Sequence, residues 1–341
     1  MTEQQWKTLL DVIQGKKVNP LPVGFIIDCP WLPNWYGVSI LDYFSNDQIW
    51  LDANLKAIET FPDVMFLPGF WSEYGMCTEP SAFGAKGIFP ANEFPHAHKV
   101  IRSSSDIESL EVPNPAKDGL LPFMLNRLKL SEPKIKDAGH EIRFAVARGP
   151  LNIASYLMGT TEFLTTMMME PDTAKLLMEK ITQFLKSWLD LQRETFPSID
   201  GILMLDDIIG FMGGDQFQEF GLPYFKTLYG ADVNVKFLHN DASCEVSIQF
   251  LPEIGINLFN MGFDTDLNHL KEVTQNKVTM LGNIPPRDVL ASGTPEDVRK
   301  VTRTLVDNLE DPSRVVFSCG GGMPPGVTSE NIQAFIDAVW Q

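Results

Sequence analysis

The stretch VKFLHNDA at residues 235–242 is an apolar run that ends in three polar residues, His239, Asn240 and Asp241. A half-buried strand spreads its polar residues along its length, whereas this one gathers them at its C-terminal tip. In parallel α/β proteins that tip is where catalytic and binding side chains lie. Because His239 and Asp241 are two residues apart, an extended strand turns both toward the same ion or substrate group.

These residue types are suited to metal binding or proton transfer. Zinc takes imidazole nitrogen, thiolate sulfur and carboxylate oxygen as ligands, with one position left open in catalytic sites. Cys319 ends the last apolar run, so His239, Asp241 and Cys319 are candidate zinc ligands. Alternatively, His239 hydrogen-bonds Asp206 or Asp207 in a polar cluster and Cys319 is a small buried apolar side chain. No GxSxG motif supports a nucleophilic serine.

Other polar residues end the remaining apolar runs. Neighbours on a strand face opposite ways, so only one of Asp206 and Asp207 can point into a shared opening, and the other would cap a helix or loop. Both, together with Asn283, are candidates for catalysis or for orienting a ligand. Arg148 is either a clamp for a substrate carboxylate or the counter-ion of these acids. Asp28 follows the first apolar run and is a candidate substrate-binding residue.

The elements that would position these residues recur regularly. Apolar strand-like runs occur at residues 22–28, 64–67, 141–149, 201–207, 235–241, 257–263, 278–283 and 314–320, with helical patterns between most of them. Eight buried strands separated by helices favour a (β/α)8 TIM barrel over a doubly wound sheet. We expect one domain, residues 1–341, with an N-terminal helical extension and an irregular insertion after the second strand. No GxGxxG or GxxxxGK motif follows a strand, so no nucleotide site is indicated.

Composition narrows the class of protein. The 341-residue chain carries a formal net charge of −17, which disfavours nucleic-acid or anionic-membrane partners. No apolar run reaches the roughly 18 residues of a membrane span, and the N-terminus lacks a secretory h-region. The four cysteines are widely separated and form no CxxC pair, which favours reduced thiols. We expect a cytoplasmic protein.

Several segments resemble the uroporphyrinogen decarboxylase superfamily. They are GGGMPPGVTSENIQAFIDAV near the C-terminus, LGNIPP, DDIIGFM and the strand end LHND. The resemblance covers most of the chain and is strongest from about residue 200 onward. It implies a (β/α)8 barrel with its site at the C-terminal mouth, and one of two chemistries: decarboxylation without a cofactor, or zinc-dependent methyl transfer to or from corrinoid proteins.

The N-terminal segment argues against the decarboxylase branch. Those enzymes carry a motif of the type PVWFMRQAGRY, whose arginines hold the substrate carboxylates. The matching stretch here, PVGFIIDCPWLPNWY at residues 22–36, contains no arginine. A substrate with many carboxylates would meet Asp28 and a strongly acidic protein. Aromatic residues near the first two strands would instead form the wall of a site for a smaller substrate, or belong to the core; they are Trp31, Trp35, Tyr36, Phe70 and Trp71.

The methyltransferase branch binds zinc through a His-x-Cys pair and a later cysteine in a GCG-like turn. This chain matches at His239, but Asp241 and Gly321 stand where the two cysteines would be, with Cys319 two residues before Gly321. The segment TEPSAFGAKGIF resembles the family's glutamate-containing segment and makes Glu79 a further candidate ligand. A harder histidine and carboxylate set is suited to polarising an oxygen or nitrogen leaving group.

The resemblance therefore implies a zinc-dependent methyltransferase that moves a methyl group between a small methoxy or methylamino donor and a corrinoid carried by a partner protein. Two alternatives remain open. One is a metal-independent decarboxylase or lyase acting on a smaller acid, with Asp28 or Asp207 as the general acid and Arg148 as the clamp. The other is a non-catalytic relative that binds a corrinoid or tetrapyrrole. Related barrels are often dimers, and no sequence feature decides between monomer and homodimer.

Overall fold

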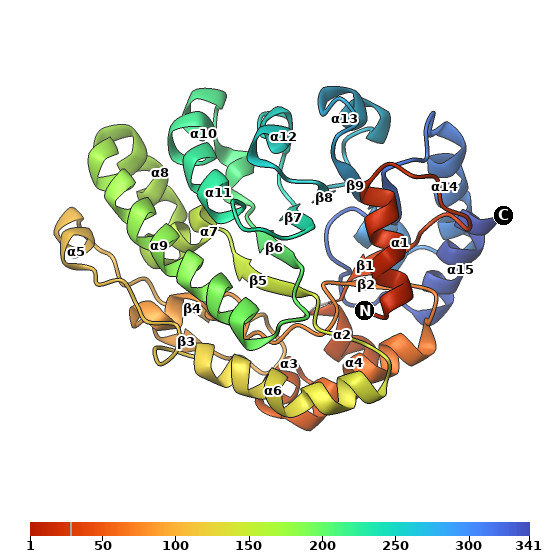
Figure 1. Ribbon diagram of the computed structural model, residues 1–341, viewed down its shortest axis with the longest axis horizontal. Coiled ribbons are helices and arrows are strands. Elements are labelled where there is room, and N and C mark those ends of the chain that lie inside the picture. The colour runs from red at the N-terminus through yellow and green to blue at the C-terminus, as the bar shows by residue number, and fades with distance from the viewer. Residues whose placement is uncertain (28) are drawn as a thin grey trace.

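The computed structural model describes residues 1–27 and 29–341 and shows a ring of parallel strands surrounded by helices (Figure 1). Six strands form one parallel sheet in the order β10-β9-β8-β7-β6-β5. They are β5 (Phe144–Arg148), β6 (Gly201–Leu205), β7 (Val235–Asn240), β8 (Leu258–Met261), β9 (Thr279–Ile284) and β10 (Val315–Cys319). The predicted α/β barrel fold is confirmed.

The two N-terminal strands complete the predicted set of eight. Strands β1 (Gly24–Ile26) and β2 (Met65–Leu67) pair in parallel with each other. A parallel bridge between Val23 and Phe317 joins β1 to β10. The pattern of short apolar runs was therefore sufficient to locate every strand of the barrel.

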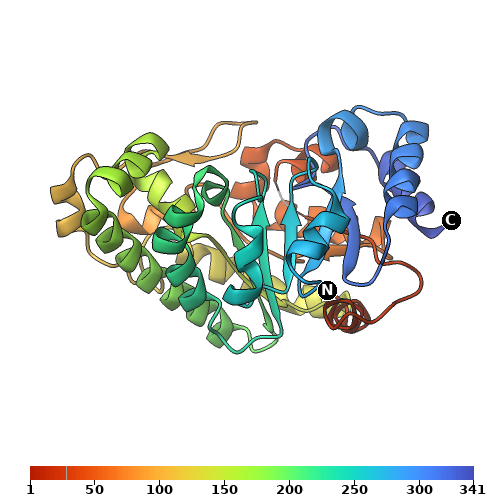
Figure 2. The ribbon, with the colours of Figure 1, turned by 90° about the horizontal axis from the view of Figure 1, so that it is seen from above.

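The helices lie outside the strands, as the view from above shows (Figure 2). Their bounds are α1 Glu3–Ile13, α2 Trp31–Tyr36, α3 Ile40–Ser45, α4 Asp47–Thr60, α5 Ser104–Ser109, α6 Leu121–Asp137, α7 Pro150–Met158, α8 Thr160–Met169, α9 Pro171–Thr195, α10 Gly214–Phe220, α11 Leu222–Leu228, α12 Leu251–Ile254, α13 Leu267–Val273, α14 Pro295–Asn308 and α15 Ser329–Trp340. Shorter helical turns are η1 Pro80–Phe83, η2 Ile208–Phe211, η3 Ile248–Phe250 and η4 Pro286–Ala291. Within the described ranges, no helix is both long enough and apolar enough to span a bilayer.

Local sequence explains where the main helices begin. The Asn46 side chain accepts hydrogen bonds from the backbone N–H groups of Gln48 and Ile49, which caps α4. Thr294 and Asp297 form a reciprocal capping box at the start of α14. These caps satisfy N–H groups that the first helical turn leaves without a partner.

The barrel interior and the N-terminal helix share one apolar core. It contains inward side chains of every barrel strand, including Phe144, Leu203, Phe237 and Val316. Trp6 of α1 packs edge-on against Phe144 with ring centroids 5.5 Å apart. The interior is therefore filled by side chains, which leaves the loops after the strands to form a site.

The predicted irregular insertion lies between β2 and β5. It contains the short antiparallel pair β3 (Gly87–Ile88) and β4 (His96–Ala97), followed by α5 and α6.

The parallel register of β6, β7 and β8 places Leu205 beside His239 and His239 beside Asn260. The polar residues of β7 and β8 therefore meet at one level of the barrel.

Candidate functional site

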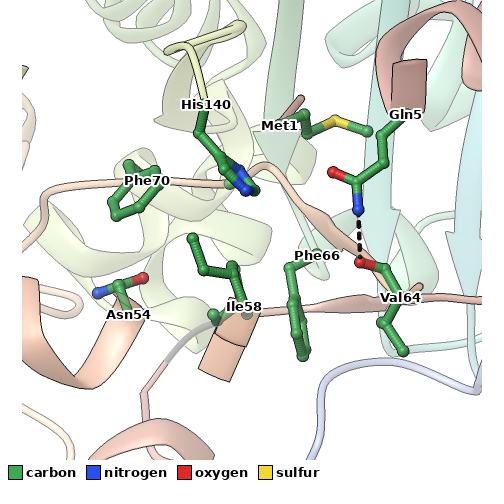
Figure 3. A pocket seen from close by; sticks show the side chains of 10 residues that line it. Met1, Gln5, Asn54, Ile58, Val64, Phe66, Phe70 and His140 are labelled. Atoms are coloured by element: carbon green, nitrogen blue, oxygen red, sulfur yellow. Dashed lines mark hydrogen bonds between the residues drawn. The ribbon is translucent and has the colours of Figure 1, made fainter. Parts of the chain in front are cut away.

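A cavity lies at the C-terminal mouth of the barrel. It has a volume of about 740 Å³ and is lined mainly by residues that follow the strands, from Asp207 after β6 to Pro325 after β10. A second pocket, between α1, α4 and the segment around β2, holds only about 10 Å³ (Figure 3). That is room for about one water molecule. The mouth cavity is the candidate site, because the predicted strand-end residues Asp207, His239 and Asp241 line it.

The imidazole of His239 has a fixed orientation in this cavity. Its Nδ1 lies 2.7 Å from Asn260 Oδ1. The Asn260 amide group donates to the Leu281 carbonyl at 2.7 Å, so its oxygen must face the imidazole and accept from Nδ1–H. Nε2 is then the nitrogen that faces the cavity, 3.5 Å from Asp241 Oδ1.

His239 is held in its charged form. Burial lowers the pKa of His239. The neighbouring carboxylates of Asp241 and Asp207, with the hydrogen bond to Asn260, together outweigh burial and raise this pKa to about 10. Burial raises the pKa of Asp241, and the charge of His239 lowers it below its ordinary value. Asp207 Oδ1 accepts the backbone N–H of Asp241 at 2.7 Å and adds negative charge nearby. At neutral pH, Nε2–H is a hydrogen-bond donor beside the cavity.

Asp241 lies in the space that a side chain at position 321 would need. Gly321 has a left-handed backbone with φ of 75°, and a Cβ built on it would overlap the Asp241 carboxylate. The Asp241 side chain is 56% exposed, whereas that of His239 is 8% exposed. Positions 241 and 321 are those where the resemblance predicted cysteines. They are coupled, because the Asp241 carboxylate occupies the space that a side chain at position 321 would fill.

The four predicted zinc ligands do not meet as a group. Cys319 is fully buried, and its Sγ donates to the Gly321 carbonyl at 3.6 Å. Glu79 Oε1 accepts the backbone N–H of Arg148 at 3.0 Å. In residues 1–27 and 29–341, no three His, Cys, Asp or Glu side chains are arranged to hold a metal ion. Of the predicted set only His239 and Asp241 are together, so these residues do not fit the three protein ligands of a catalytic zinc.

Arg148 is the centre of a buried ionic cluster at the wall of the cavity. Its Nη2 lies 2.5 Å from Glu73 Oε2, and its Nη1 lies 3.6 Å from Glu79 Oε2. Burial raises the pKa of Glu73, and the Arg148 charge offsets part of that effect. Arg148 is therefore a counter-ion, as one of the two interpretations held, and its partners among the described residues are Glu73 and Glu79.

The adjacent aspartates after β6 have separate surroundings. Asp207 lines the cavity. Asp206 is fully buried, and its Oδ2 accepts the backbone N–H of Leu151 at 2.9 Å, which caps the start of α7. Burial raises the pKa of Asp206 well above its ordinary value. Asp207 thus faces the opening and Asp206 caps a helix, which is the division expected for two neighbours on a strand, and the catalytic role considered for Asp206 is corrected to a structural one.

Asn283 also differs from its predicted role. Its amide donates to the Gly262 carbonyl at 3.3 Å and to the Thr265 carbonyl at 2.7 Å. These bonds fix the loop that follows β8, and Asn283 is not among the residues that line the mouth cavity. We therefore assign it to positioning of that loop, which carries Phe263 and Asp264.

Of the aromatic residues predicted to form a wall, Trp71 lines the cavity, whereas Trp31 and Tyr36 lie elsewhere. Trp31 is fully buried in the core, where its indole N–H donates to the Val327 carbonyl at 3.1 Å. Tyr36 is partly buried against the same core. Neither lines the cavity; its apolar lining includes Trp71, Met76, Phe94, Phe263 and Met323. Asp28 lies outside the described residues.

Sequence reasoning missed several polar lining residues. They are Glu73, Asn152, Tyr156, Asp264, Arg287 and Asp288. Glu73 carried a weak signal, because it is a lone acid within the aromatic stretch FWSEY. The others belong to a helix or to loops beyond the strand tips, where periodicity gives no signal.

Comparisons with known proteins agree on the family. The model of the family described as uroporphyrinogen decarboxylase (URO-D) matches residues 4–341. A uroporphyrinogen decarboxylase from Pseudomonas putida is 24% identical over 310 residues, covering 86% of this chain and 83% of the relative. Another from Syntrophotalea carbinolica is 26% identical and covers 70% of each chain. Among solved structures, a methyltransferase from Methanosarcina mazei has a TM-score of 0.82 at 18% identity, covering 98% of both chains.

Proposed function

The chain belongs to the uroporphyrinogen decarboxylase family, and we propose that within it the protein transfers the methyl group of a small methoxy compound to a corrinoid carried by a partner protein. The observation that carries this proposal is the cavity-facing Nε2–H of His239, held between Asn260 and Asp241. A charged imidazole beside an apolar-walled cavity is suited to protonate an oxygen as it leaves carbon.

The charges around the cavity weigh against a substrate that bears many carboxylates. Such a substrate requires several unpaired cationic side chains. Of the arginines that line the cavity, Arg148 is engaged with Glu73 and Glu79, which leaves Arg287. Asp207, Asp264 and Asp288 line the same space and would repel an anion.

The proposed reaction uses His239 as a general acid. A corrinoid on the partner would supply the nucleophile that accepts the methyl group. The donor lies with its ring against Trp71 and its ether oxygen at His239 Nε2. As the carbon–oxygen bond breaks, its electron pair goes to the oxygen, and His239 transfers its proton there.

The acidity of His239 suits an aromatic leaving group. The pKa of His239, about 10, is close to that of a phenol, also about 10. After the transfer, Asp241 is left beside a neutral imidazole, and its half-exposed carboxylate is stabilised by water. A phenol is also far more acidic than an alkyl alcohol, so a phenolate leaves carbon more readily, which supports an aryl methyl ether as the donor over an alkyl one.

The test supplies reduced free cobalamin as the methyl acceptor and a panel of methoxyarenes as donors. We expect phenol release, together with an absorbance change of the acceptor, that wild-type protein supports and His239→Gln does not. Activity that survives His239→Gln would contradict the proposed acid. Activity that a chelator removes and zinc restores would instead support a metal-dependent reaction. Binding of cobalamin without methyl transfer would support the non-catalytic alternative.

A further inference from the structure

The mouth cavity has an excess of unpaired negative charge. Two ion pairs on its wall neutralise themselves, Arg148 with Glu73 and His239 with Asp241. Three further lining carboxylates, those of Asp207, Asp264 and Asp288, form no ion pair within the described part of the chain. Arg287 is the remaining cation among the described lining residues.

The unpaired acids come from three separate loops of the mouth. Asp207 follows β6, Asp264 follows β8 and Asp288 lies in the helical turn η4 after β9. Asp264 and Asp288 are exposed at the opening, whereas Asp207 is half-buried below it. Carboxylates from separate loops that line one cavity create a negative potential inside it.

Aromatic side chains of the same cavity also favour a positively charged ligand. Trp71, Phe94, Tyr156 and Phe263 line the space together with these acids. Aromatic faces attract cations as well as flat rings. A ligand with an aromatic ring and a positive group is therefore attracted by both the aromatic side chains and the acids. A ring that carries a carboxylate is repelled by the acids at the rim.

We propose that the substrate of this cavity is an aryl methyl ether that also carries a protonated amine, with the ammonium group held by Asp264 and Asp288 at the rim. The methyl ether part rests on the proposed function, whereas the preference for positive charge rests on the lining residues alone. The ring would lie against the aromatic wall, with the methoxy group directed to His239 at the floor.

The test compares three probes that share one ring and differ in charge. They are 2-(4-methoxyphenyl)ethylamine, 2-(4-methoxyphenyl)ethanol and 4-methoxyphenylacetate, and their dissociation constants are measured by calorimetry without any corrinoid. We expect the amine to bind about fivefold to tenfold tighter than the alcohol, because an exposed ion pair contributes up to about 1 kcal/mol. The acetate should bind weaker than the alcohol by a similar factor. Salt at about 0.5 M should reduce both differences in dissociation constant, because it screens the charges.

Two variants locate the effect. Asp264→Asn with Asp288→Asn should remove most of the advantage of the amine over the alcohol. Asp232→Asn is the matched control, because this exposed aspartate precedes β7 at the opposite end of the barrel. Equal binding of amine and alcohol, or tighter binding of the acetate, would overturn the proposed substrate class.

The same series separates this inference from the proposed function. A preference for the amine that is lost in the double variant supports the charge assignment even when no methyl transfer is detected. Methyl transfer from the alcohol at the same efficiency as from the amine would leave the proposed function standing and contradict the cationic substrate.

Discussion

Two ionic clusters lie at the mouth of the barrel, and they differ in whether a charged group remains available to a ligand. In the cluster of Arg148, Glu73 and Glu79, the side chains of all three residues are buried and directed at one another. In the cluster of His239, Asp241 and Asn260, the imidazole is buried but the Asp241 carboxylate is 56% exposed. The second cluster therefore keeps a charged N–H group available to a ligand.

The comparison teaches how the same residue types divide between structure and chemistry. An arginine between two buried carboxylates has its charge neutralised and has no remaining affinity for a substrate acid. A histidine fixed on one side by an amide keeps its other nitrogen for chemistry. We accordingly expect changes in the first cluster to reduce stability and changes in the second to reduce activity.

The largest effect should follow from His239→Gln. Loss of a general acid lowers the rate by about 10²–10⁴-fold. The loss should shrink for 4-nitroanisole, because its more acidic phenol leaves without help from a proton donor. Rates for both donors, measured beside His269→Gln on the exposed surface of α13, check this expectation. An equal loss for the two donors would contradict the role of His239 as an acid.

Arg148→Met should affect folding more than catalysis. Removal of one partner leaves Glu73 and Glu79 buried without their counter-ion, which destabilises by about 3–5 kcal/mol. Urea unfolding measures the change. The variant that also carries Glu73→Gln and Glu79→Gln should recover part of the stability. If Arg148→Met unfolds like wild type while substrate binding is lost, Arg148 is a substrate clamp and the comparison fails.

Asp241→Asn should change the pH dependence. Because the folded pKa of His239 is raised to about 10, its contribution to stability is present below about pH 6.5 and is lost as pH rises through about 10. Activity should fall over the same upper range as the proton leaves Nε2. Without the Asp241 charge, burial is the dominant effect on the pKa of His239. The pH at which activity falls should therefore move down by several units. Histidine NMR titration of wild type and variant measures the shift, and an unmoved His239 titration would exclude this coupling.

Gly321→Ala should have the smallest effect of the series. A side chain at a left-handed position costs about 1–2 kcal/mol, and here it also displaces Asp241 from His239. Gly139→Ala is the matched control, since Gly139 has φ of 77° and open space around a Cβ. We expect both variants to lose stability through the backbone strain, and Gly321→Ala to lose somewhat more. Only Gly321→Ala should lower the pH above which activity falls.

The same geometry makes a gain of metal binding testable. Side chains at positions 239, 241 and 321 converge on one point, so Asp241→Cys with Gly321→Cys should create a histidine and two thiolates around it. Zinc content after dialysis measures the outcome. Stoichiometric zinc in wild type as well would show that Asp241 already supports a metal site.

The strands of the barrel were predictable from the sequence because they are buried on both faces. Their apolar runs are continuous, and the runs of β6 and β7 end in polar residues that line the mouth cavity. Both the strand count and the position of His239 and Asp207 therefore followed from local pattern. The amphipathic helices and their caps were equally local. The family followed from short motifs, and the match over residues 4–341 agrees with it.

The sequence by itself thus determined the barrel, the family and the strand end VKFLHND as the place of chemistry. Only the tertiary structure decided which neighbours each side chain has. Asp206 turned to cap α7, Trp31 entered the core, Glu79 joined Arg148, and Asp241 filled the space above Gly321. The physical reason is that side-chain direction, burial and ion pairing depend on residues far apart in the chain, which no local pattern encodes.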